Sequence, residues 1–186
     1  MEKNRVAIYF DGSNFYHKLK SNQINIKNIS RFDYREFSKW LARERKIVSC
    51  RYYVGVVRAK EGDTRAQMLR KNQQKFFAHL TSKKQGFVVK RGDLIKNGGC
   101  YHEKGVDVKI AVDLLVGAYE NIFDTAILVS SDNDLVPAIK KVKSLGKQVE
   151  YIGFSHQPSF ALQKNATLSR LLIKEELEIF ECKDEK

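Results

Sequence analysis

The feature that most constrains this chain is a buried strand that runs directly into an acidic turn. Residues 126–129 read Ala-Ile-Leu-Val, and the next five residues read Ser-Ser-Asp-Asn-Asp. A helical pattern follows from about Asn133 and ends at Gly146. Ligands of open α/β sheets bind in the crevice beyond the carboxyl ends of the strands, so this turn brings Asp132 and Asp134 to such a crevice. Two carboxylates this close in the chain repel each other, and a divalent cation between them is the simplest partner.

Strand and helix patterns alternate along the rest of the chain. The apolar run at 5–10 is typical of a central parallel strand that is buried on both faces, and the glycine-containing stretch 91–104 reads as a hairpin or a loop. We expect further strands at 47–57, 86–90, 126–129 and 147–152, and helices at 15–19, 34–45, 65–81, 105–118 and 133–145. This alternation predicts a three-layer α/β/α fold with a central, mainly parallel sheet.

The length of 186 residues favours a single domain with a hydrophobic core of ordinary size. We expect this domain to span residues 1–155 and residues 156–186 to form a C-terminal extension that packs on it. Within the extension, residues 168–173 fit a helix or a strand equally well. The charged end, residues 175–186, is expected to be frayed.

The formal net charge of +12 limits the classes of partner. It suits nucleic acid, an acidic membrane surface or an acidic protein as the partner. The alternative is that the excess lysine has no partner and only keeps the protein soluble. No amphipathic basic helix has an aromatic face, and no apolar run approaches the roughly 20 residues that span a bilayer, so a membrane partner is ranked last. The three cysteines are widely separated, which argues against a disulfide framework and a zinc site. We therefore expect a cytoplasmic protein.

Two more aspartates are predicted at the same edge of the sheet as the acidic turn. Asp11 follows the first strand directly, and Asp107 stands at the amino end of the helix that leads into the strand at 126–129. With Asp132 and Asp134, these carboxylates would make a site of oxygen ligands, which select Mg²⁺ or Mn²⁺ over zinc. An acidic pocket in a basic surface suits a metal-dependent nuclease, because the metal activates water while lysine and arginine attract a polyanion.

Each of these acids also has an ordinary structural explanation. Asp11, and either Asp132 or Asp134, could cap the helix that follows it. Asp107 could interact favourably with the helix dipole, which is worth typically about 0.3–1 kcal/mol. Asp113, on the same helix as Asp107, is expected to be structural or to lie on the surface. All of these explanations together would make the meeting of the acids a coincidence, so the metal site is preferred.

Other candidate residues give weaker signals. Tyr52, Tyr53 and Tyr101 could stack on bases, although core or hairpin packing is the more usual role for the first two. The four histidines have no ligand spacing, and no glycine-rich nucleotide-binding motif follows the first strand.

Three segments together resemble the NYN domain family. They read VAIYFDGSNF at 6–15, EKGVDVK at 103–109 and LVSSDNDL at 128–135, in the order and spacing of the family. The chain looks most like the LabA-like branch, whose members have the PIN-like nuclease fold, and the similarity covers residues 5–154. One departure is Asn133 and Leu135, where the family more often has a small residue and a phenylalanine.

The resemblance implies a ribonuclease that depends on Mg²⁺ or Mn²⁺ and hydrolyses RNA phosphodiester bonds. It implies that the metal-holding, catalytic acids are Asp11, Asp107, Asp132 and Asp134. On the same resemblance, Asn14 positions water or substrate, Lys104 neutralises a phosphate, and Ser131 of the acidic turn contacts the substrate. Asp113 matches a recurrent acid of the family, and its role is left open.

Two other functions remain open. A non-catalytic RNA-binding or regulatory module of the same fold would keep the acids for folding. A phosphatase of the haloacid dehalogenase type also begins with a strand-end aspartate, but it needs a second acid two residues later, where this chain has Ser13. The sequence leaves undecided the RNA target, the polarity of cleavage, the number of metal ions and whether the protein is a homo-oligomer.

Overall fold

The expected central sheet forms, with its strands in the order β4-β3-β2-β1-β5-β6-β7. The structure is a computed structural model that describes residues 4–57, 62–97 and 100–181. The strands are β1 (Arg5–Asp11), β2 (Lys46–Val57), β3 (Val88–Asn97), β4 (Cys100–Lys104), β5 (Thr125–Val129), β6 (Gln148–Phe154) and β7 (Leu168–Leu172). Neighbouring strands are parallel except for β3 and β4, which form an antiparallel hairpin. The prediction of a mainly parallel sheet is confirmed.

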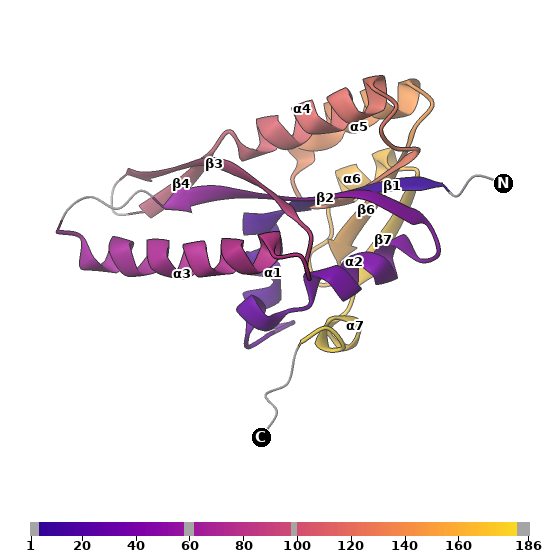
Figure 1. The fold of residues 1–186 in the computed structure, drawn as a ribbon. Helices are drawn as coiled ribbons and strands as arrows, with labels where there is room; N and C mark the ends of the chain where they lie inside the picture. Colours follow the sequence, from indigo (N-terminus) through magenta and orange to yellow (C-terminus); the bar gives the residue numbers. More distant parts are fainter. Residues whose placement is uncertain (1–3, 58–61, 98–99, 182–186) are drawn as a thin grey trace.

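Helices cover both faces of the sheet (Figure 1). They are α1 (Gly12–Lys20), α2 (Tyr34–Ala42), α3 (Thr64–Thr81), α4 (Val106–Tyr119), α5 (Val136–Ser144), α6 (Phe160–Asn165) and α7 (Lys174–Glu178), with 3₁₀ turns η1 (Ile29–Arg31) and η2 (Asn133–Leu135). Residues of α1, α2, α3 and α7 belong to the hydrophobic core on one face, and residues of α4, α5 and α6 belong to the core on the other. The molecule therefore has the three layers of a PIN-like α/β/α fold.

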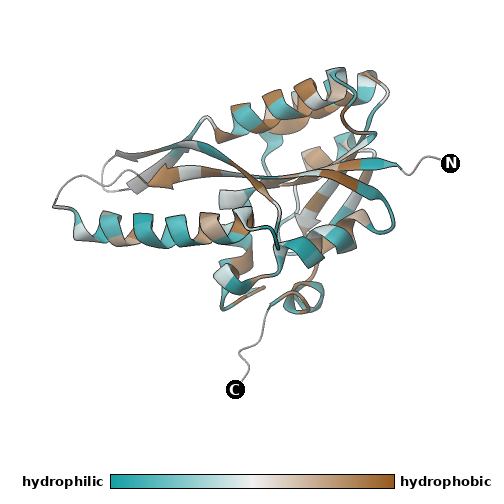
Figure 2. Cartoon of the chain, viewed as in Figure 1, coloured by the Kyte–Doolittle hydropathy of each residue, from teal (hydrophilic) through white to brown (hydrophobic). Residues whose placement is uncertain are grey.

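β1 separates the two cores, and its side chains alternate between them. Val6, Ile8 and Phe10 face one core, while Ala7 and Tyr9 face the other, because successive side chains of a strand point to opposite faces. All five side chains are buried. Figure 2 shows the central strands as hydrophobic and α3 as largely hydrophilic along its length. The apolar run at 5–10 is thus a strand buried on both faces, as its composition predicted.

The boundaries of several elements differ from their predicted positions. The helix expected to reach residue 45 ends at Ala42, because Arg43 has a φ of 56° and leaves the helical region. The helix expected from Asn133 begins with η2, and α5 starts only at Val136, with Pro137 in its first turn. β3 continues well beyond residue 90, because it pairs with β4 in the hairpin.

The C-terminal segment adds a strand and a helix to this architecture. Residues 168–172, which fitted either a helix or a strand, form β7 and pair with β6. Part of the charged end forms α7, and Leu177 and Phe180 are buried there. Phe180 packs on Phe37 and Trp40, so apolar contacts hold this part of the end in place. Residues 182–186 lie outside the described residues. Over the part of the chain that the structure describes, no helix has the length and apolar character needed to cross a membrane.

Candidate functional site

Asp11 is the last residue of β1 and the N-cap of α1, so the strand passes into the helix without a loop. Its Oδ1 accepts a hydrogen bond from the backbone N–H of Asn14 at 3.1 Å, and its Oδ2 accepts one from the hydroxyl of Ser130 at 2.8 Å. Gly12 allows the start of α1 to lie close to β2, because a Cβ there would lie 2.2 Å from a ring carbon of Tyr52. Asp11 does cap the helix, as its ordinary explanation predicted, and it is almost fully buried while doing so.

Ser130 connects Asp11 to the acidic turn after β5. Its hydroxyl donates to Asp11 and accepts a hydrogen bond from the backbone N–H of Asp132 at 3.1 Å. Asp132 in turn caps η2, where its Oδ1 accepts from the backbone N–H of Asp134 at 2.9 Å. β1 and β5 are neighbours in the sheet, and the partner of Phe10 is Val129. Two segments far apart in the sequence therefore end beside each other.

The third segment of the site is the connection from β4 to α4. Gly105 makes this connection in a left-handed conformation, with a φ of 77°, and α4 starts at the next residue. Asp107 lies in the first turn of α4 and is exposed. Glu103 lies on β4, where a carboxylate oxygen accepts a hydrogen bond from the backbone N–H of Gly55. The start of α4 and the end of β4 thus contribute one acid each.

The acids of the three segments lie close enough for their charges to raise one another's pKa values. The pKa of Asp11 is raised to about 6, chiefly by burial and to a smaller extent by the negative charges of Glu103 and Asp107, while the hydrogen bonds from Asn14 and Ser130 oppose the rise. Burial also raises the pKa of Asp107, and Asp132 and Asp134 add to the rise. Like charges therefore act on one another across the carboxyl edge of the sheet.

Glu103 belongs to this acidic edge, although the sequence analysis did not select it as a site residue. Burial raises the pKa of Glu103 first, and the charge of Asp107 raises it further. Its position depends on the hairpin of β3 and β4, in which Leu94 pairs with Glu103. The only sequence signal was its place within the segment at 103–109, because the stretch 91–104 read equally well as a hairpin or a loop.

The other predicted site residues lie next to the acids. The side-chain oxygens of Asn14 and Ser131, Oδ1 and Oγ respectively, are buried and have no hydrogen-bond partner among the residues that the structure describes. A buried polar atom without a partner is costly, and it indicates a site for a ligand or water. Lys104 is exposed at the end of β4.

These donors fit a hard divalent cation in their chemistry. They are carboxylate, amide and hydroxyl oxygens, which are the ligands that Mg²⁺ and Mn²⁺ prefer. Within residues 4–57, 62–97 and 100–181, however, no three His, Cys, Asp or Glu side chains are already arranged closely enough to hold a metal ion. Asp107 and Asp134 are exposed, so their side chains are free to change rotamer.

Asp113 has a different environment from the acids at the edge. Its Oδ2 accepts a hydrogen bond from the hydroxyl of Tyr53 at 2.7 Å and forms ion pairs with Arg51 at 3.0 Å and Lys90 at 3.5 Å. These partners come from β2 and β3, so Asp113 ties α4 to the sheet. This arrangement agrees with the expected structural role.

The tyrosines that were considered for base stacking are core residues. Tyr52 and Tyr53 are 1% and 0% exposed, so neither has a free face at the surface. Core packing, the more usual role, is thus the observed one for both. The side chain of Tyr101 lies outside the described residues.

Comparisons with known proteins agree with this architecture. A family model described as NYN domain matches residues 5–171 of the chain. Among solved structures, a protein of unknown function from Vibrio parahaemolyticus RIMD 2210633 is similar to the chain, with 22% sequence identity and a TM-score of 0.63. This match covers 92% of the present chain and 94% of that chain, and at this identity it shows the fold alone. A comparison with curated proteins finds no match.

Proposed function

The chain belongs to the NYN domain family, which is generally related to nucleases and RNA, and we propose that it is a ribonuclease dependent on Mg²⁺ or Mn²⁺. In this proposal the protein is a hydrolase of RNA phosphodiester bonds, and Asp11, Asp107, Asp132 and Asp134 are its metal-holding, catalytic acids. Its assignment to the LabA-like branch and to the cytoplasm stays a prediction.

The observation that carries the proposal is the meeting of acids from separate segments at the carboxyl edge of the sheet, where the hydroxyl of Ser130 joins Asp11 to the backbone N–H of Asp132. The chain has a net charge of +12, yet burial and neighbouring acids raise the pKa values of Asp11 and Asp107. Carboxylates in such surroundings favour the binding of a cation. Perturbed carboxylates at a strand-end crevice are typical of an active site.

The residues around the acids have separate tasks in the proposed reaction. A bound divalent ion supplies activation of water and stabilisation of the charge on the phosphate. Asp11 is held rigidly by Asn14 and Ser130, so it fixes the position of the site, while the exposed Asp107 and Asp134 adjust to what binds. Asn14 Oδ1 and Ser131 Oγ, which lack hydrogen-bond partners in the described part of the chain, are free to orient water or substrate. Lys104 offers a positive charge to a phosphate.

Cleavage of RNA by the purified protein tests this proposal. With Mg²⁺ or Mn²⁺ the wild-type protein is expected to cut single-stranded RNA, and EDTA is expected to stop it. Asp11→Asn and Asp132→Asn should each lower the rate by about 100-fold or more, because they remove a ligand charge without changing the shape of the side chain. Circular dichroism checks that both variants stay folded. Cleavage at the wild-type rate in both would refute the assigned site.

A non-catalytic RNA-binding module is the second candidate, and one observation favours it. No three potential ligands are already arranged around a common point in the described ranges of the chain. This candidate predicts RNA binding that persists in EDTA, with no cleavage under any metal condition. Metal-dependent turnover that Asp132→Asn abolishes would exclude it.

A further inference from the structure

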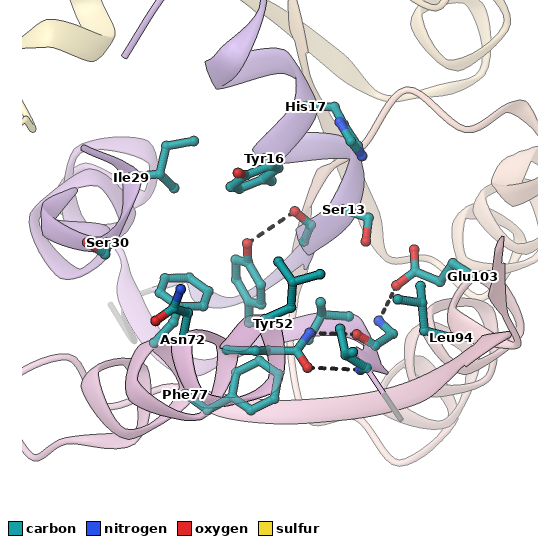
Figure 3. Close-up of a pocket in the computed structure, with 17 residues that line it drawn as sticks. Ser13, Tyr16, His17, Ile29, Ser30, Tyr52, Asn72, Phe77, Leu94 and Glu103 are labelled. Carbon is teal, nitrogen blue, oxygen red and sulfur yellow. Dashed lines mark hydrogen bonds between the residues drawn. The ribbon is translucent and has the colours of Figure 1, made fainter. Parts of the chain in front are cut away.

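A cavity of about 780 Å³ opens directly beside the acidic edge (Figure 3). Residues of α1, including Ser13, Tyr16 and His17, line one side, and residues of α3, including Asn72 and Phe77, line another. Its volume lies within the roughly 300–1,000 Å³ that is usual for small-molecule sites in proteins. The cavity is therefore large enough to admit a compact, ring-shaped group.

The cavity and the acidic edge share residues, so a single ligand can occupy both. Gly12 and Ser13 line the cavity and follow Asp11 directly in the chain. Glu103 also lines it, forms a hydrogen bond with the side chain of Ser13, and raises the pKa of Asp11 through its charge. If the backbone of a bound polymer lies at the acids, a side group attached to that part of the backbone lies at the mouth of this cavity.

The lining combines aromatic faces with a polar group that has no partner. Tyr16, which is 46% exposed, lines the cavity together with the buried rings of Tyr52 and Phe77, and aliphatic side chains complete the apolar lining. Asn72 is exposed on α3, and its amide forms no hydrogen bond within the described residues. Aromatic rings stack on the faces of nucleobases, and an amide can pair with their edges. This combination suits a planar heterocycle, which has apolar faces and polar edges.

The charge of the surrounding surface suits the backbone of the same ligand. Besides the residues that line the cavity, α3 carries the exposed side chains of Arg65, Arg70, Lys71 and Lys75. Basic side chains along a helix attract a phosphate backbone regardless of its sequence. The helix that lines the cavity is therefore also a basic surface.

We propose that this cavity receives one unpaired nucleobase of the RNA whose phosphodiester lies at the acidic edge. The proposal rests on the proposed ribonuclease function and narrows its substrate to single strands and loops. A base that enters a cavity between α1 and α3 cannot remain in a duplex, so paired RNA must first unstack that nucleotide. Tyr16 is the residue on which the base stacks.

Fluorescence of 2-aminopurine tests base entry independently of cleavage. The probes are single-stranded oligoribonucleotides with 2-aminopurine at one position each, and they bind the full-length Asp132→Asn variant in Mg²⁺, with RNA integrity checked on a gel. Stacking on an aromatic ring is expected to quench the emission at one position. In a fully paired duplex of the same sequence, 2-aminopurine is already quenched by its neighbours, and its emission is expected to stay unchanged when the protein is added.

Substitutions at Tyr16 in the Asp132→Asn background connect this signal to the cavity. Tyr16→Ala should abolish the quenching and weaken RNA binding about 5- to 100-fold, because it removes a stacking surface. Tyr16→Phe keeps the ring and should retain both signals. Tyr119→Ala is the matched control, since Tyr119 is 61% exposed on α4, which covers the other face of the sheet.

The outcomes separate this proposal from the proposed function. Unchanged emission at every position, absence of RNA binding, or quenching that survives Tyr16→Ala would overturn the base site. Cleavage by the wild-type protein without base entry would support the ribonuclease function and overturn the base site. Base entry with no cleavage by the wild-type protein would support the cavity site and refute the ribonuclease function.

Discussion

Asp107 and Asp113 lie on the same helix, α4, but their charges have opposite surroundings. Asp113 accepts a hydrogen bond from Tyr53 and pairs with Arg51 and Lys90. The charged groups that act on the pKa of Asp107 are Asp132 and Asp134, and both raise it. An acid that serves the fold is surrounded by partners, whereas an acid that serves a ligand lacks them until the ligand binds.

Acids at the two edges of the sheet also differ in whether they are paired with a cation. At the amino edge, Asp124 pairs with Arg5 at 2.8 Å, and this interaction lowers the pKa of Asp124 to about 2. At the carboxyl edge, the pKa of Asp11 rises to about 6. In a chain with a net charge of +12, cations are available for pairing, yet among the described residues the charged groups that act on the pKa of Asp11 are the acids Glu103 and Asp107, which makes that edge the candidate functional one.

Replacement of Asp113 should cause the largest change in stability. Asp113→Ala leaves the partly buried Arg51 and the hydroxyl of Tyr53 without their acceptor, and it is expected to lower the free energy of unfolding by about 2–3 kcal/mol. Urea denaturation measures this change. Asp107→Ala is the matched control on the same helix and should cost at most about 1 kcal/mol, through the lost interaction with the helix dipole. An equal loss of unfolding free energy in both variants would contradict the claim that Asp113 serves the fold and Asp107 does not.

The stability of the metal-free protein should fall as pH rises through the titration of Asp11. Its folded-state pKa of about 6 exceeds the ordinary value of 3.8, so the folded state binds the proton more tightly than the unfolded state. The stabilisation is complete below pH 3.8 and is lost as pH rises through about 6. At pH 8, Asp11→Asn should therefore be more stable than the wild type by about 1–3 kcal/mol. Denaturation curves in EDTA across this range measure the difference, and a less stable variant at pH 8 would contradict it.

Mg²⁺ or Mn²⁺ should stabilise the folded protein by a smaller amount. At an ion concentration ten times the Kd, binding to the folded state alone adds about 1.4 kcal/mol to the free energy of unfolding. Thermal unfolding with and without the ion measures this effect. The stabilisation should disappear in Asp132→Asn and persist in Lys90→Ala, which alters only the surroundings of Asp113. Loss of the effect in both variants would mean that the ion acts elsewhere.

Most of the fold could be predicted because local patterns determine it. The apolar runs of β1 and β5 are buried on both faces, and such runs have few other arrangements in an α/β fold. The predicted boundaries failed where a single backbone conformation decides, as at Arg43, whose φ is positive. The identity of β7 was also undecided, because Leu168–Leu172 becomes a strand only through its pairing with β6.

Site residues that depend on short sequence patterns could be predicted, and those that depend on tertiary packing could not. Asp11 ends β1 and Asp132 lies in the turn after β5, so the sequence alone brings them to one edge. Glu103 and the cavity beside it depend on the hairpin of β3 and β4 and on the packing of α3, which no short sequence pattern specifies. The partners of Asp113 lie on β2 and β3, far from it in the chain, and only the tertiary structure identifies them.

A crystal structure of the wild-type protein soaked in Mn²⁺ tests the central claim most directly, because anomalous scattering locates the ion without reference to activity. We predict an anomalous peak at the carboxyl edge of the sheet, with oxygen ligands from Asp11, Asp107, Asp132 and Asp134 at the distances usual for Mn²⁺. A fully soaked crystal without a peak among these aspartates, or with its only peak beside Asp113, would contradict the account.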